Sequence, residues 1–98
     1  MASRRKLKKS IDYVVSDLIL DCVTYTSLYQ KPNDEEALKI IQDTLILRNE
    51  LRDQANHPER KDKSETVKNY FNNLAKSLIG GVDEGYGKLG KLVNQEDK

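Results

Sequence analysis

A regular apolar pattern near the start of the chain limits the folds that are open to it. Between Leu7 and Tyr29, apolar side chains recur at steps of three and four residues, which is the spacing of one face of an α-helix. This pattern predicts an amphipathic helix over residues 3–29. Leu20 and Leu28 widen its apolar face beyond what one neighbouring helix covers. We therefore expect at least two helices to pack against it.

Two prolines divide the rest of the chain into two further helical segments. Pro32 and Pro58 mark turns, because proline cannot continue a helix interior. Between them, periodic apolar residues predict a helix over residues 34–56 with Asn33 as its N-cap. Ser3 is the expected N-cap of the first helix. The positions predicted to face inward in the second helix are Ala37, Ile41, Thr44, Leu45, Arg48, Leu51 and Ala55.

The third helical segment contains glycines that could end it early. After a charged turn at residues 57–63, the pattern predicts a helix over residues 64–92 that is capped by Asp62 or Ser64. The pair Gly80–Gly81 resembles a stop signal, yet the steps of three and four residues continue beyond it. Each interior glycine costs about 1 kcal/mol relative to alanine. The second half of this helix is therefore expected to fray or to depend on a partner.

Three helices joined by short turns predict an all-α fold, an elongated antiparallel three-helix bundle in up-down-up order. The length of 98 residues suits a single helical domain over residues 1–98. Its two ends, residues 1–5 and 94–98, are expected to be mobile, because few contacts hold chain termini in place.

Positive charge is concentrated at one end of the first helix. The whole chain has a net charge of only +1, which excludes the overall basic character of a DNA-coating protein. The first ten residues carry only positive charges, at the end of the helix dipole that disfavours cations. In an up-down-up bundle, residues 1–12 and 50–66 share one end, where nine basic and six acidic side chains gather. A solvated helix end is the alternative explanation. The candidate contacts for an anionic partner are Arg4, Arg5, Lys6, Lys8 and Lys9.

No combination of residues predicts an enzyme, a metal site or a bound cofactor. Asp17 and Asp21 share one helix face, but a metal site in a helical bundle would also need Glu-x-x-His motifs. The single histidine, His57, lies in a predicted turn. Cys22 lies in the apolar helix, where a buried reduced thiol is the ordinary expectation. A nucleophilic pairing of Cys22 with His57 lacks a third orienting group.

Two further patterns match nucleotide or nucleic-acid binding only in part. Gly85–Gly90 spells G-x-G-x-x-G, but the dinucleotide motif needs a strand before it and a helix after it. Here the register is helical, so the glycines predict a small-residue helical face or a flexible tail. A polar face of the third helix fits either phosphate and base contacts or ordinary exposure to water. Its residues are Lys68, Asn69, Asn72, Asn73 and Lys76.

Acidic residues in the first helix argue against export and membrane insertion. Asp12, Asp17 and Asp21 interrupt the apolar run. A membrane-spanning helix needs about 20 nearly uncharged residues, and a signal peptide needs an unbroken apolar segment before its cleavage site. We therefore expect a cytoplasmic protein.

The opening of the chain also resembles a known group of sequences. The stretch Ser3–Tyr13, followed by Asp17-Leu18 and Asp21-Cys22, is similar to the start of a family of small uncharacterised bacterial all-helical proteins. Those proteins begin with S-R-x-x-L-K-K-x-I-x-Y and carry a later acidic-Cys pair. The resemblance implies a helical fold and a bacterial cytoplasmic setting, and it carries over no activity and no site residues.

Taken together, these patterns predict a non-enzymatic protein-interaction or assembly module. The wide apolar face of the first helix leaves surface that a homodimer or another protein partner would bury. The glycine-interrupted end of the third helix points the same way. The alternative is a nucleic-acid-associated accessory protein that uses the basic N-terminal end.

Overall fold

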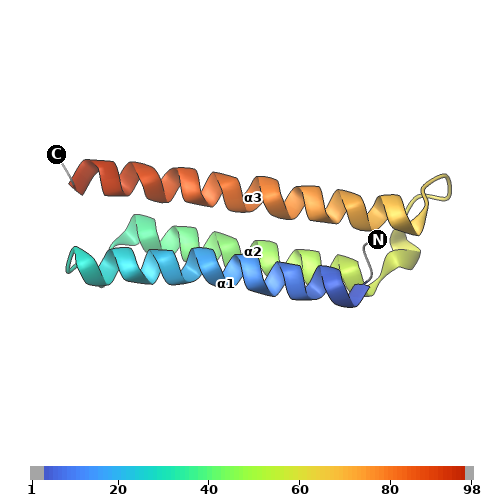
Figure 1. Ribbon diagram of the computed structural model, residues 1–98, viewed down its shortest axis with the longest axis horizontal. Coiled ribbons are helices and arrows are strands. Elements are labelled where there is room, and N and C mark those ends of the chain that lie inside the picture. Colours follow the sequence, from blue (N-terminus) through green and yellow to red (C-terminus); the bar gives the residue numbers. More distant parts are fainter. Residues whose placement is uncertain (1–3, 97–98) are drawn as a thin grey trace.

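Three long helices make up almost all of the structure, a computed structural model that describes residues 4–96. Helix α1 spans Arg4–Leu28, α2 spans Glu35–Asn56 and α3 spans Val67–Glu96, with a short 3-10 turn at Pro58–Arg60. The helices run side by side along a rod that measures 51 × 21 × 18 Å (Figure 1). No strand occurs in residues 4–96. The prediction of an elongated all-α bundle of three helices in up-down-up order is confirmed.

The start of α2 corrects the predicted cap. Asp34, and not Asn33, is the N-cap: its Oδ1 accepts hydrogen bonds from the backbone N–H groups of Glu36 and Ala37, each at 3.0 Å. The bond from Ala37 is the largest cause of the lowered pKa of the Asp34 carboxyl, and the bond from Glu36 lowers it further. Its Oδ2 also accepts a hydrogen bond from the Tyr25 hydroxyl at 3.1 Å, which ties the cap to α1. Asn33 lies one residue too early for these bonds.

The start of α3 differs from the prediction as well. Thr66 precedes the helix, and its Oγ1 accepts a hydrogen bond from the N–H of Asn69 at 3.1 Å. Neither Asp62 nor Ser64 therefore caps it, and the predicted helix over 64–92 is shifted to later residues. The Tyr70 hydroxyl donates to the Gln54 carbonyl at 2.8 Å, which fixes this end of α3 against α2.

The chain ends are helical as far as they are described. Arg4 and Arg5 belong to α1, and residues 94–96 belong to α3. The other positions predicted to be mobile, 1–3 and 97–98, lie outside the described residues, as does the predicted cap Ser3.

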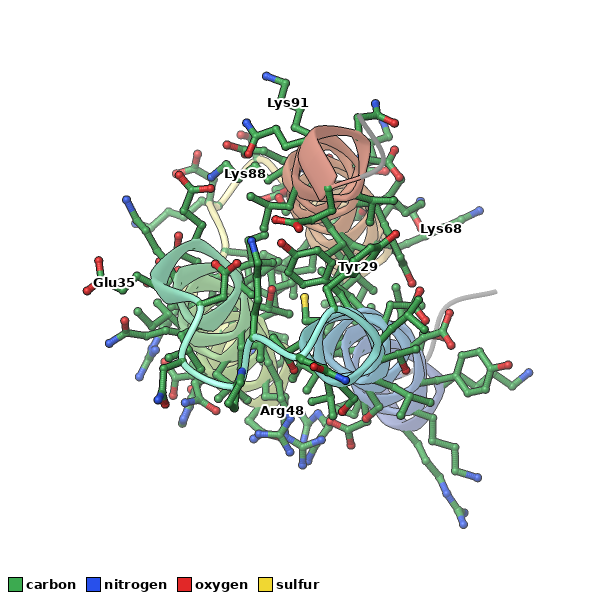
Figure 2. All side chains as sticks on the ribbon, turned by 90° about the vertical axis from the view of Figure 1, so that its left-hand side faces the viewer. Tyr29, Glu35, Arg48, Lys68, Lys88 and Lys91 are labelled. Carbon is green, nitrogen blue, oxygen red and sulfur yellow. The ribbon has the colours of Figure 1, made fainter. Side chains whose placement is uncertain are left out.

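The core runs along the centre of the bundle and uses a narrower face of α2 than expected. Ile40 is only 5% exposed, whereas Leu45 is 42% exposed and Ile41 is half-buried. Arg48 lies at the open edge between α1 and α2, on the side away from α3, so its predicted inward position is wrong (Figure 2). Packing against α3 selects this register, because Ile40 lies toward α3 beside Gly85. The buried apolar residues of the core are Leu7, Ile11, Val15, Leu18, Cys22, Tyr25, Ala37, Ile40, Leu51, Ala55, Phe71, Leu74, Leu78, Val82, Leu89 and Leu92.

The glycines of α3 do not interrupt the helix. The helix continues through Gly80 and Gly81 as one element to Glu96, as predicted. Gly81 and Gly85 are four residues apart and face the packed side, where a Cβ would come within 2.5 Å of Leu47 Cδ2 and 2.6 Å of Leu18 Cδ2. These two glycines therefore let α3 approach its neighbours closely.

Candidate functional site

A basic hollow lies at the N-terminal end of α1, where α1 meets α2. Four of the five residues predicted to contact an anionic partner line it, whereas Lys6 does not. Arg52 of α2 joins them, which agrees with the predicted meeting of residues 1–12 and 50–66 at one end of the bundle. We call this surface the basic hollow, and its lining residues are Arg4, Arg5, Lys8, Lys9, Asp12 and Arg52.

Asp12 organises the basic hollow. Its Oδ2 accepts a hydrogen bond from Arg52 Nη1 at 2.5 Å, and its Oδ1 accepts one from Arg48 Nε at 3.1 Å. Lys8 Nζ donates to Asn56 Oδ1 at 2.9 Å, so a second contact joins the same two helices. This role of Arg48 was not predicted from the sequence. The only available signal was that an arginine on an apolar face needs an acidic neighbour.

The basic hollow keeps an excess of positive charge. Five cationic side chains surround the single carboxylate of Asp12, and the first turn of α1 contains no acidic residue. The helix dipole adds partial positive charge at the same end. The surface therefore suits carboxylate or phosphate groups of a partner.

An acidic and apolar hollow lies next to it on α1. It shares Asp12 with the basic hollow and is otherwise lined by Tyr13, Ser16, Asp17 and Leu20. Tyr13 is 78% exposed and Leu20 is 61% exposed, although both are large apolar side chains. We call this surface the acidic apolar hollow.

Asp17 is held in place by α3. The Tyr86 hydroxyl donates to Asp17 Oδ2 at 3.1 Å, and burial together with this bond raises the pKa of Tyr86 to about 12. The phenol therefore stays protonated at neutral pH and donates this hydrogen bond. Among residues 4–96, no group of three or more His, Cys, Asp or Glu residues could hold a metal ion. Asp17 and Asp21 both lie beside the Tyr86 hydroxyl.

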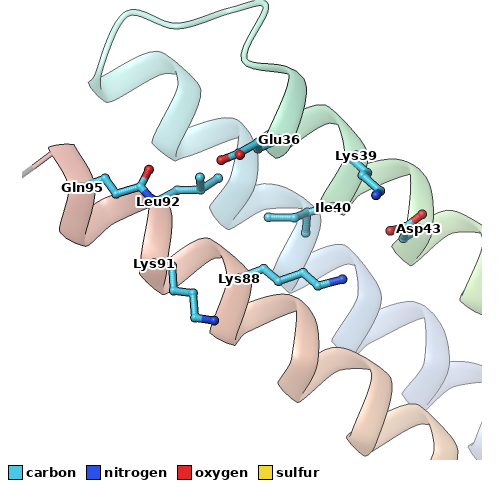
Figure 3. A pocket seen from close by; sticks show the side chains of 8 residues that line it. All are labelled: Glu36, Lys39, Ile40, Asp43, Lys88, Lys91, Leu92 and Gln95. Atoms are coloured by element: carbon cyan, nitrogen blue, oxygen red, sulfur yellow. The ribbon is translucent and has the colours of Figure 1, made fainter.

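A third concave surface lies between α2 and α3 (Figure 3). Its floor is apolar, formed by Ile40 and Leu92, and its rim mixes lysines with carboxylates and an amide. Lys88, from within the G-x-G-x-x-G sequence, extends over it and forms an ion pair with Glu84 at 3.4 Å. That sequence lies entirely inside α3, so it does not form a phosphate-binding loop. The rim residues are Glu36, Lys39, Asp43, Lys88, Lys91 and Gln95.

The structure does not bring the predicted reactive residues together. Cys22 is fully buried in the core, where burial first and Asp21 second raise its pKa to about 11, so the thiol is protonated at neutral pH. His57 lies at the C-cap of α2, with its Nδ1 2.9 Å from Glu59 Oε1. The polar residues of α3 that sequence analysis singled out, Lys68, Asn69, Asn72, Asn73 and Lys76, are all exposed.

Comparison with known proteins adds no relative from which a role could be transferred. Searches of protein-family models, curated proteins and solved structures found no match to this chain. Among the described residues, no helix combines the length and the apolar character needed to cross a membrane. The resemblance of the first residues to a bacterial family stays a prediction, and the exposed surfaces are the basis for any functional argument.

Proposed function

We propose that this protein is a non-enzymatic interaction or assembly module that binds a protein partner, either a second copy of itself or a different protein, through the outer face of α1. The observation that carries the proposal is the exposure of large apolar side chains on a helix whose opposite face already forms the core. Tyr13, Leu20 and Leu28 are 78%, 61% and 71% exposed, and Val23 is also exposed. Single exposed apolar residues are ordinary, but a series on one helix favours an interface.

The spacing of these residues supports a helical contact. Tyr13, Ser16, Leu20, Val23 and Ser27 follow one another at alternating steps of three and four residues. That spacing places them in one row along a helix, which is the arrangement that packs against another helix. The two serines are small and would let a partner helix approach. We call this row the outer seam.

A photo-crosslinker at Leu20 tests the proposal. We expect the variant Leu20→p-benzoylphenylalanine to form a protein adduct in its native cells after irradiation, because the outer seam would lie against a partner. The matched control is Lys68→p-benzoylphenylalanine, since Lys68 is exposed on α3 and points into solvent (Figure 2). Equal labelling at both positions, or none at Leu20, would refute the proposal.

A second candidate function is binding of nucleic acid through the basic hollow. The observation that favours it is the convergence of Arg4, Arg5, Lys9 and Arg52 around one concave surface. Contacts with phosphates would make binding strongly salt-dependent. The experiment is retention of the protein on a mixed nucleic-acid pool at low salt, with Arg4→Ala/Arg5→Ala/Lys9→Ala for comparison. Failure of the unmodified protein to be retained would end this idea.

We also propose that the protein is located in the cytoplasm, whichever of the two functions is correct. The buried, reduced thiol of Cys22 is compatible with a reducing compartment. Fractionation of the native cells tests it, and recovery of the protein outside the cytoplasm would contradict it.

A further inference from the structure

We infer that the partner of the outer seam is a second copy of this chain, bound with the two α1 helices antiparallel. This inference rests on the proposed function and names the occupant of its surface. The argument uses the two hollows of α1, which have opposite charge and lie next to each other on one helix.

The charges of α1 are arranged in two blocks. Arg4, Arg5, Lys6, Lys8 and Lys9 occupy its first turns, and Asp12, Asp17 and Asp21 follow with no further Lys or Arg before residue 31. Two such helices side by side in parallel would set like charges against each other. In an antiparallel pair, the basic block of each copy faces the acidic block of the other. The surface of α1 is therefore complementary to itself in one orientation only.

The outer seam sets the position of the contact. Lys9 lines the basic hollow four residues before Tyr13, and Asp17 lines the acidic apolar hollow four residues after it. A two-fold axis beside Tyr13 would place Lys9 of each copy level with Asp17 of the other. In such an isologous contact every pairing occurs twice. The two Tyr13 rings would then meet at the axis.

The same arrangement accounts for two features that folding of a single chain leaves unexplained. Lys6 lies seven residues before Tyr13 and Leu20 lies seven residues after it. Across a two-fold axis at Tyr13, the exposed side chain of Leu20 would therefore lie against the long aliphatic part of Lys6 from the second copy. The cations at the positive end of the α1 dipole would gain the carboxylates of Asp17 and Asp21 as neighbours. One contact therefore covers the apolar residues and offsets the unfavourable charge.

Charge reversal tests the pairing. Lys9→Glu and Asp17→Lys should each weaken self-association about tenfold or more in sedimentation equilibrium, because each creates two like-charge contacts. The double variant Lys9→Glu/Asp17→Lys should recover most of that loss, since both pairs are then opposite in charge again. Circular dichroism of each variant shows whether it is folded, which matters for Asp17 because Tyr86 binds it.

A disulfide at the axis gives an independent test. Tyr13→Cys should form a covalent dimer rapidly under mild oxidation, because the two positions meet at the two-fold axis. The matched control is Lys68→Cys, on the exposed face of α3, which should not form a covalent dimer under the same conditions. Native Cys22 is buried and stays in both variants.

Two results would overturn the inference. One is a monomer up to millimolar concentration with no preferential Tyr13→Cys disulfide. The other is a dimer that charge reversal weakens without recovery in the double variant. If the chain is monomeric but the Leu20 photo-crosslinker captures a different protein, the self-association is wrong while the proposed interaction function stands. If the chain does not self-associate and the Leu20 photo-crosslinker captures no protein, both the self-association and the proposed interaction function are wrong.

Discussion

The backbone of Gly85 in α3 lies directly against the side chain of Leu18 in α1. A Cβ at residue 85 would be 2.6 Å from Leu18 Cδ2, well inside the normal contact distance, and Leu18 is fully buried. Around Gly87, two residues further on, no atom beyond the adjoining residues and backbone of its own helix lies within 4 Å of the corresponding position. The two glycines therefore differ in what they do, although they belong to the same G-x-G-x-x-G sequence.

This difference predicts opposite effects of two alanine substitutions. Gly87→Ala should raise the free energy of unfolding by about 0.5–1 kcal/mol, because alanine favours the helix and meets open space. Gly85→Ala gains the same preference, but the crowding against Leu18 costs about 1–3 kcal/mol, so it should be clearly less stable than Gly87→Ala. Urea unfolding of both variants measures the difference. Equal stability of the two would contradict the close approach of α3 to α1.

Substitutions on the two faces of α1 should differ in the same experiment. Leu18→Ala removes a fully buried side chain and should lower the free energy of unfolding by about 2–5 kcal/mol. Leu20→Ala changes an exposed side chain and should alter the unfolding of the monomer by less than about 0.5 kcal/mol. The measurement is made at low micromolar concentration. A large loss of stability for Leu20→Ala would mean that the outer seam is part of the core.

The cap of α2 gives a third prediction. Asp34→Ala should lower stability by about 0.5–2 kcal/mol, because it removes the acceptor for two backbone N–H groups. Asp34→Asn keeps an acceptor and should lose less, and Asn33→Ala serves as the control with little change. The lowered pKa of Asp34 means that its contribution is present at neutral pH and is lost as acid protonates the folded carboxyl. Thermal unfolding of the four proteins compares them, and an Asn33→Ala loss as large as that of Asp34→Ala would exclude Asp34 as the cap.

Alkaline pH should destabilise the protein. The pKa of Cys22 rises from 9.0 to about 11, and those of Tyr25 and Tyr86 rise from 10.0 to about 12, with burial as the main cause. The unfolded chain therefore releases these protons at lower pH than the folded chain. Stability should fall as pH rises from about 9 toward 12, because the folded state binds more protons over that range. Urea unfolding at several pH values measures the slope.

The variant Cys22→Ala isolates one of these groups. Its stability should decline less steeply between pH 9 and 11 than that of the unmodified protein, whatever the cost of the substitution at neutral pH. An equal slope in both proteins would show that the thiol does not contribute.

The sequence was sufficient to predict the number, order and approximate bounds of the helices, because the apolar spacing and the two prolines are local signals. It was not sufficient to choose the inner face of α2. Ile40 and Ile41 are adjacent and equally apolar, so only packing against α3 decides that Ile40 is buried. The caps at Asp34 and Thr66 were missed for a related reason. Several polar residues precede each helix, and the hydrogen bonds that select one of them depend on how the turn folds.

The candidate surfaces were also predictable only where they depend on helix order and not on the register between helices. The meeting of the basic N-terminal residues with Arg52 was predictable from the up-down-up order alone. The role of Asp12 was not, because its contact with Arg48 spans 36 residues and depends on the register between two helices. The wide apolar face of the first helix predicted that some apolar side chains would remain exposed. It did not show that Leu20 would be one of them.

The odd number of helices has a mechanical consequence. Helix α1 begins at one end of the rod, which is 51 Å long, and α3 ends at the other (Figure 1). Lys31, in the turn after α1, forms an ion pair with Glu96 at the end of α3. Anything fused before α1 and anything fused after α3 would be held apart at nearly the full length of the bundle. The fold would therefore act as a rigid spacer between two fused segments. A donor–acceptor pair of dyes attached at the two ends would report bending or unfolding of the bundle as a change in energy transfer.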